Sequence, residues 1–268
     1  MSSPSPRRGA RKAAQSRGFR VLARIGYVAL GAVHVLIGGL MLVVAGGGSG
    51  ETDQNGAMRV IADAPAGFAA LWAVAAGLWA LAAWKIVEGT LVWARSGAKK
   101  WGRRVSRWAQ AVAYAAIGGV AASVALGSRS DGDTTTENAS SGLLAPPGGV
   151  FVLGAIGLGV VGIGVGFVIL GAKRSFRSKI AAPAGLVGAA VDVIGTVGYI
   201  AKGIALGIVG GLLVTAAVRH DGDAAGGLDE ALHTLLGVAF GPWLVAFVGV
   251  GFIAYGAFCG FRARYARF

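Results

Sequence analysis

The sequence predicts an all-α, polytopic membrane protein with six transmembrane helices, arranged as three tandem two-helix repeats of parallel topology. The chain of 268 residues is 55% hydrophobic and only 14% charged, whereas a soluble domain carries about 25% charged residues. Its apolar residues fall in six long runs, and its basic residues fall in alternate connections between those runs. We expect three such repeats to close into a pseudo-threefold bundle.

Each apolar run is long enough to cross the hydrocarbon core of a bilayer, which takes about 20 residues of helix. Lipid offers the backbone no hydrogen bonds, so helices are the expected form of these spans. The runs are too long and alternate too weakly to be strands of a membrane barrel. The predicted spans are residues 25–46, 68–94, 105–127, 149–172, 193–218 and 235–260.

Charged residues divide the connections into two kinds. The net charge is +13, and 20 of the 25 lysines and arginines lie in the N-terminal tail, the second and fourth connections and the C-terminal tail. Ten of the twelve acidic residues lie in the first, third and fifth connections. This alternation follows the positive-inside rule, and it predicts a multi-pass protein of the bacterial inner (cytoplasmic) membrane with both termini in the cytoplasm.

The basic loops suggest membrane lipids as partners, because anionic head groups attract basic segments beside spans. Nucleic-acid binding is disfavoured, since the sequence contains no recognisable nucleic-acid-binding module. We expect no cofactor and no metal. Cys259 is the only cysteine, which excludes cysteine-based zinc and iron–sulfur sites, while His220 and His233 lie among acids of the fifth connection and specify a metal site only weakly.

The spans repeat about every 86 residues. Gly-Tyr-Val-Ala-Leu-Gly at 26–31 matches Gly-Tyr-Ile-Ala-Lys-Gly at 198–203, with a weaker copy at 113–118. Each copy contains one tyrosine: Tyr27, Tyr114 and Tyr199. The predicted units are a basic tail (1–20), repeat 1 (21–95), repeat 2 (105–175), repeat 3 (185–262) and a short basic tail (263–268).

The connections on the acidic side also correspond. Residues 56–63 of repeat 1 and 227–234 of repeat 3 each predict a short amphipathic helix at the membrane interface, just before the chain re-enters. The equivalent segment of repeat 2, residues 131–141, is a polar Thr/Ser/Asn stretch followed by two prolines. We expect a loop there.

With these motifs the chain resembles an uncharacterised family of bacterial integral membrane proteins, defined by a thrice-repeated two-helix transmembrane domain of unknown function. The resemblance covers about residues 20–265 and rests on Gly-Tyr-x-x-x-Gly in the first helix, the amphipathic turn and a second helix rich in small residues. The middle copy departs most, because Ala113 replaces the glycine. The family implies a fold and a membrane location, but no activity.

The 47 glycines predict close helix packing. Residues 157–162 match a dinucleotide-binding pattern, but they lie inside an apolar span, where helix packing is the better interpretation. Several glycines are four residues apart, a spacing that places them on one helix face. Whether such faces pack within or between protomers stays open. The predicted packing positions are Gly31, Gly118, Gly203, Gly207, Gly211, Gly162, Gly166, Gly256 and Gly260.

Ionisable residues inside spans are costly and mark candidate functional sites. Lys202 lies about 12 Å and Glu88 about 10 Å from the basic side, at 1.5 Å per helical residue. Their similar depth and opposite charge suggest that they pair between repeats 1 and 3. Lys85, three residues before Glu88, is a rival partner for it, and alternatively both lysines extend separately to the head groups.

His34 is one turn deeper than the position equivalent to Lys202, near the middle of the membrane. It either relays protons or, as is more usual for a single histidine, hydrogen-bonds the backbone of a neighbouring helix. The repeat tyrosines are explained by packing with one hydrogen bond for each hydroxyl. Cys259 is expected to be a small packing residue.

The sequence contains no catalytic motif, so we do not expect an enzyme. A structural or interaction component of the membrane is the first interpretation, with a homo-oligomer or another membrane protein as partner. The alternative is a small-solute or ion transporter or channel that uses Lys202, Glu88 and His34 in the interior of the bundle.

Overall fold

The computed structural model describes residues 17–91, 97–128, 132–180 and 185–265, and within these it is entirely helical. Most of the N-terminal basic tail lies outside the described residues. The elements in chain order are α2 (Arg17–Ala45), α3 (Gln54–Ala62), α4 (Gly67–Thr90), α5 (Gly97–Ala125), α6 (Gly132–Leu144), α7 (Gly149–Ala172), η1 (Ser175–Lys179), α8 (Leu186–Arg219), η2 (Gly222–Ala224), α9 (Leu228–Leu236) and α10 (Gly241–Tyr265).

Six of these helices, α2, α4, α5, α7, α8 and α10, are long and apolar enough to cross a membrane. They confirm the six predicted spans, although the sixth was predicted to begin too early. Leu235 and Leu236 end α9, and α10 begins only at Gly241. The span was predicted to begin too early because the last residues of α9 are apolar and lie only a few residues before α10, so the two form one apolar run in the sequence.

The sharp turn before each second span recurs in all three repeats. Ala66, Gly148 and Phe240 have φ values of 62°, 86° and 61°, and each is followed by a glycine that begins the span. At Gly67 and at Gly241 a Cβ atom would collide with carbonyl oxygens at the end of the preceding short helix. A left-handed residue followed by glycine therefore lets the short outer helix fold back onto the span.

The polar segment of repeat 2 forms a helix, α6, so the predicted loop is wrong. Its last residue, Leu144, precedes the turn and span in the same way as the last residues of α3 and α9. Low hydrophobicity made the segment resemble a loop, but helices at an interface need only a partial apolar face. The amphipathic helices predicted in repeats 1 and 3 are confirmed as α3 and α9.

The tightest helix pairs join different repeats. The second span of each repeat packs along the first span of the next, as α4 with α5, α7 with α8, and α10 with α2. The last of these pairs joins repeat 3 back to repeat 1, so the predicted pseudo-threefold closure is present at this interface and not between α5 and α7. Within repeats, α2 contacts α4 and α8 contacts α10, whereas α5 and α7 hardly touch.

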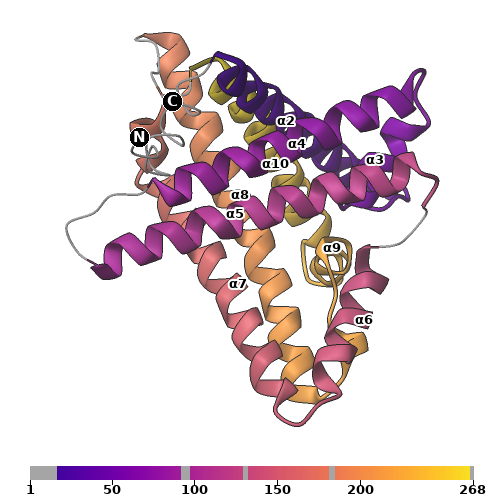
Figure 1. Cartoon of the computed structure of the whole chain (residues 1–268). Helices are drawn as coiled ribbons and strands as arrows, with labels where there is room; N and C mark the ends of the chain where they lie inside the picture. Colours follow the sequence, from indigo (N-terminus) through magenta and orange to yellow (C-terminus); the bar gives the residue numbers. More distant parts are fainter. Residues whose placement is uncertain (1–16, 92–96, 129–131, 181–184, 266–268) are drawn as a thin grey trace.

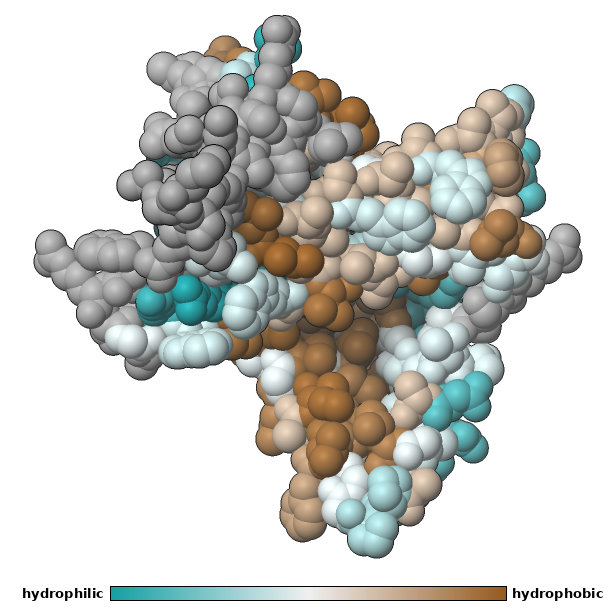
Figure 2. All heavy atoms as spheres, viewed as in Figure 1, coloured by the Kyte–Doolittle hydropathy of each residue, from teal (hydrophilic) through white to brown (hydrophobic). Residues whose placement is uncertain are grey.

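Figure 1 shows the consequence for the shape: the α4–α5 pair runs across the view, and the α7–α8 pair descends from it, so the two pairs diverge toward α3 and α6. Hydrophobic residues cover the lower arm formed by α7 and α8, with hydrophilic residues beside it around α6 (Figure 2). This apolar arm is the surface expected of helices that face lipid.

Glycines line two of these interfaces, at a spacing of seven residues rather than four. On α2, Gly31 and Gly38 face Gly256 and Gly249 of α10. A Cβ atom on Gly31 would lie 2.8 Å from the carbonyl oxygen of Gly256, and one on Gly256 would lie 2.6 Å from that of Gly31. The backbones are therefore in direct contact, as small residues permit.

The α7–α8 pair uses the same device. Gly164 faces Gly203, and Gly157 faces Gly210, again seven residues apart on each helix. Gly118 packs under the Trp79 ring. The backbone of Gly207 lies against Gly164, although a Cβ atom on Gly207 itself would meet nothing.

Several of the glycines named from the sequence for their spacing of four do not form close contacts within the chain. A Cβ atom on any of these would have no neighbour within 4 Å: Gly162, Gly166, Gly211 and Gly260. Seven residues are close to two full turns of an α-helix, so residues with this spacing lie on nearly the same face and can meet the same neighbouring helix.

Candidate functional site

The two polar side chains placed deepest in the spans contact each other. Lys202 Nζ of α8 lies 2.8 Å from His34 Nε2 of α2, and His34 Nδ1 lies 2.8 Å from the carbonyl oxygen of Leu30 on its own helix. If the amine donates to Nε2, then Nδ1 carries the proton and donates to Leu30. The ring is thereby held by both nitrogens, and it is only 4% exposed.

Aromatic rings surround this pair. Lys202 Nζ lies 4.5 Å from the centroid of the Tyr255 ring and 5.7 Å from that of Phe167. His34 packs against Phe252 and Tyr255, with centroids 5.6 Å and 4.8 Å apart. Ring faces attract a cation, so these aromatic rings stabilise an ammonium to which the described residues offer no ion-pair partner.

Glu88 does not pair with Lys202. Among the described residues its ion-pair partners are Lys85 on the same helix, at 2.6 Å, and Arg107 of α5, at 3.0 Å. The rival pairing with Lys85 is therefore the one the structure shows. Equal depth was a poor guide, because it says nothing about which spans are neighbours.

Neither lysine extends separately to the head groups. The Lys85 side chain is only 1% exposed and ends on Glu88, and Lys202 is partly buried and ends on His34. Both therefore depart from the behaviour usual for lysines near the ends of membrane helices. Their polar ends are satisfied inside the bundle instead.

The repeat tyrosine Tyr27 contacts a residue that the sequence interpretation missed, Arg262 of α10. Its guanidinium carbon lies 4.5 Å from the centroid of the Tyr27 ring, and its charge interacts electrostatically with the hydroxyls of Tyr27, Tyr199 and Tyr114. Arg262 is 9% exposed. In the sequence Arg262 resembled one more residue of the C-terminal basic tail. Its position within one helical turn of the predicted sixth span was the signal that could have identified it as a buried residue.

The tyrosine rings are buried, as packing residues should be. Tyr199 packs against several aromatic rings, including Phe176 at 5.4 Å and Phe258 at 5.5 Å. Cys259 is fully buried beside them. The centre of the basic end is thus an aromatic core that encloses one arginine.

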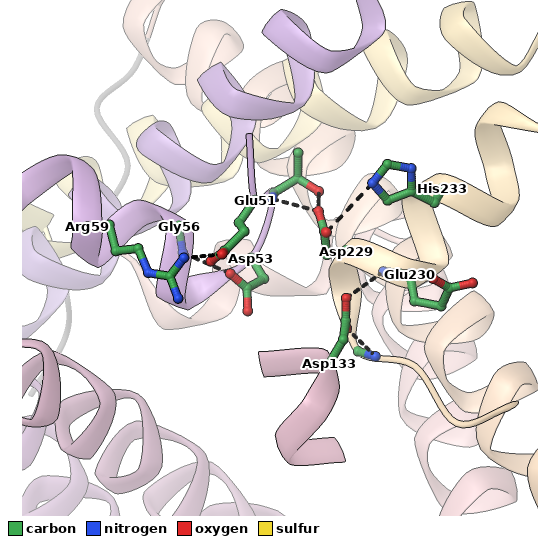
Figure 3. A network of polar contacts seen from close by, with 10 residues as sticks. Glu51, Asp53, Gly56, Arg59, Asp133, Asp229, Glu230 and His233 are labelled. Carbon is green, nitrogen blue, oxygen red and sulfur yellow. Dashed lines mark hydrogen bonds and ion pairs between the residues drawn. The ribbon is translucent and has the colours of Figure 1, made fainter. Parts of the chain in front are cut away.

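A second polar network joins the repeats at the opposite, acidic end (Figure 3). Thr52 donates its backbone N–H (2.7 Å) and its hydroxyl (2.5 Å) to one carboxylate oxygen of Asp229. Asp133 accepts the backbone N–H groups of Gly227 at 2.6 Å and Glu230 at 3.1 Å. These bonds connect repeat 1 to repeat 3 and repeat 2 to repeat 3.

Other polar contacts at this acidic end join residues of repeat 1 to one another. Asp53 caps α3 by accepting the backbone N–H of Gly56 at 2.9 Å, and Arg59 forms an ion pair with Glu51. The carboxylate of Asp53 also lies against Gly132 at the start of α6. Carboxylates at helix N-termini are favourable because they accept unpaired amides and complement the helix dipole.

Asp133→Ala should destabilise the fold by about 2 kcal/mol, because two charge-assisted bonds to the start of α9 are lost. Thermal unfolding of the purified protein in detergent measures this. Glu137→Ala removes the same charge from the same helix and should change stability by less than about 0.5 kcal/mol. Equal losses in the two variants would show that charge alone, and not the bonds to α9, matters.

The described residues include no group of three or more His, Cys, Asp or Glu side chains that could hold a metal ion. His233 lies 3.7 Å from Asp229, within one short helix. Asp229 in turn accepts the two bonds from Thr52, so this pair belongs to the contact between repeats.

Six apolar helices, threefold internal repetition and charge at both ends of the spans define a multi-pass, all-α membrane protein. Comparison with known families is specific. The model of a family described as Domain of Unknown Function (DUF1206) matches three times, at residues 25–91, 105–174 and 197–266. The chain belongs to this family.

A relative has a similar length. The chain is 26% identical over 248 residues to "Uncharacterized protein YxxB" of Bacillus subtilis (strain 168), an alignment that covers 90% of this chain and 89% of the relative. No solved structure matches the chain significantly. These likenesses bear out the expected repeated-domain family and carry no activity.

Proposed function

We propose that this protein is a small-solute or ion transporter or channel of a bacterial inner membrane, with both termini in the cytoplasm, and not an enzyme. The observation that carries the proposal is the hydrogen bond between Lys202 and His34 inside the spans. Ionisable groups at such depth are costly, and they are typically retained where protons or solutes move. Charge asymmetry between the two ends supports the orientation.

Protons and small anions are the classes that suit this pair. A neutral imidazole accepts from an ammonium, and a proton can pass between them without a carboxylate. The cage of Tyr255 and Phe167 tolerates the cation, while a small anion would supply the counter-charge that the interior lacks.

Flux into proteoliposomes tests the proposal. Wild type should dissipate an imposed pH gradient, read with trapped pyranine, or an imposed chloride gradient, read with a chloride electrode. Lys202→Leu should reduce that flux by about tenfold or more, since the pair is lost. Lys173→Leu, which removes an exposed lysine after α7, should keep it.

Two results of this flux assay would contradict the proposal. If wild type moves neither protons nor chloride above empty liposomes, the pair is not a conduction site for either class. If Lys173→Leu lowers flux as much as Lys202→Leu, surface charge is responsible and the pair is not.

The second candidate is a structural or interaction component, and the glycine contacts favour it. Backbones meet at Gly31–Gly256 and at Gly164–Gly203, so these interfaces are tightly packed and leave little room for movement. Surface glycines such as Gly162 and Gly166 would then be available to a second copy or another membrane protein. Purification in mild detergent, followed by identification of bound proteins, tests this function directly.

A further inference from the structure

A cluster of buried charges at the basic end of the bundle is unbalanced. It consists of Lys85, Arg107 and Arg262, and Glu88 is the one carboxylate that the described residues contribute. The four residues come from three repeats, and the two repeat 1 residues share α4. We propose that this cluster, the basic-end site, binds an oxyanion of the phosphate class, either free or as the phosphate of an anionic lipid head group.

Contacts within the cluster leave one cation without a counter-charge. Glu88 gives one oxygen to Lys85 and the other to Arg107, so both of its oxygens are used. Arg262 interacts electrostatically with Glu88 and Lys85. Within the described residues, however, no carboxylate lies within 4.0 Å of its guanidinium, which packs against the Tyr27 ring instead.

Burial makes this imbalance expensive. The side chain of Lys85 is 1% exposed and Arg262 is 9% exposed. A charge removed from water is tolerated when it is paired and hydrogen-bonded, and otherwise costs several kcal/mol. Three cations near one carboxylate therefore favour a further negative group at this site, and the carboxylates of the described residues do not supply it.

The donor set indicates the chemistry of that group. A guanidinium presents N–H groups in a planar fork that matches two oxygens of a phosphate. Lys85 and Arg107 also keep N–H donors beyond those that they give to Glu88. Several donors around one point favour an anion with several oxygens over a halide.

Position favours access from the basic side of the membrane. Lys85 precedes the end of α4 by five residues, and Arg262 precedes the end of α10 by three, which places them about 7 Å and 5 Å along the helix axis. Glu88 and Arg107 are partly exposed, with side-chain exposures of 31% and 21%. The site thus opens at the depth of the lipid head groups.

Binding can be measured on the full chain, purified in dodecyl maltoside and stripped of lipid. In one arm, thermal unfolding is followed against inorganic phosphate, with chloride at equal ionic strength as the reference. In the other, the same protein is placed in mixed micelles with phosphatidylglycerol or, for comparison, phosphatidylcholine. A ligand of the folded state raises the unfolding temperature with concentration.

Stabilisation by phosphate beyond chloride assigns the site to a free anion, and stabilisation only by phosphatidylglycerol assigns it to a head group. Arg262→Gln should weaken the apparent affinity about tenfold or more, because a charge-assisted fork is lost. Arg264→Gln, two residues on along the same helix and exposed, should leave it within about twofold.

Two further variants keep the test decisive if Arg262→Gln does not fold. Arg262→Lys retains the charge without the fork and should bind with intermediate affinity. Arg107→Gln alters the more exposed edge of the site and should also weaken binding about tenfold. The proposal is overturned if neither ligand stabilises wild type, if Arg107→Gln binds as wild type does, or if Arg264→Gln loses as much affinity as Arg262→Gln.

Discussion

Leucine in place of Gly38 is expected to destabilise the folded bundle by about 3 kcal/mol or more, and to separate α2 from α10. A Cβ atom at this position would lie 2.5 Å from the carbonyl oxygen of Gly249 and 2.8 Å from a side-chain carbon of Ile253. Overpacking of a well-packed interior costs about 1–3 kcal/mol even where side chains can move. Here one of the obstructing atoms is backbone, so the helices themselves must move.

The adjacent residue supplies the control. A Cβ atom on Gly39 would have nothing within 4 Å, so leucine there should leave stability unchanged or raise it by up to about 1 kcal/mol through better helix propensity. Thermal unfolding in detergent, monitored by helical circular dichroism, compares the two. A loss at Gly39 as large as that at Gly38 would mean that the close contact with α10 is not what makes the position sensitive.

The second large effect concerns the intramembrane pair, and it is asymmetric. His34→Leu should cost about 3–5 kcal/mol, because it leaves the Lys202 amine inside the bundle without its hydrogen-bond partner. Lys202→Leu should cost much less or stabilise the fold. It removes the costly group, and His34 keeps its bond to Leu30.

The double variant His34→Leu/Lys202→Leu closes the cycle. Its stability should return most of the way to that of Lys202→Leu, since no unpaired amine remains. Unfolding of all four proteins in one detergent provides the measurement. If His34→Leu and Lys202→Leu are equally destabilising and their effects add, the two side chains are not energetically coupled.

The six spans and their threefold repetition were readable from the sequence because their signals are local. Span length and the recurrence of Tyr27, Tyr114 and Tyr199 are properties of short segments. The wrong prediction, a loop at residues 131–141, also came from a local signal. Residues 131–141 lack the hydrophobicity on which helix prediction relies, yet the turn at Gly148 and Gly149 repeats that of the other two copies and identifies α6 by position.

The site could be predicted only in part, because its geometry depends on which spans are neighbours. Lys202, His34, Glu88 and Lys85 were all named as candidates from their depth. Their partners depend on lateral position, and depth does not determine it. The tight pairs join the second span of one repeat to the first of the next, an arrangement that the chain order does not suggest.

The glycine interfaces illustrate the same limit. Gly38 and Gly210 occupy equivalent positions in repeats 1 and 3, as Gly31 and Gly203 do, so the seven-residue spacing was present in the sequence. Spacing of four is as frequent in a chain with 47 glycines. Only the crossing angle of the helices distinguishes the two patterns, and that angle is a property of the folded pairs.

The pairing of α10 with α2 sets the order in which this protein can be completed during synthesis. The first span enters the membrane with its Gly31 and Gly38 face uncovered, and the helix that covers this face is synthesised after the other five spans. Each of the three tight helix pairs joins two different repeats, so no single repeat contains one of them. Until α10 is inserted, α2 therefore lacks the partner of its Gly31 and Gly38 face, whereas the α4–α5 and α7–α8 pairs can already form.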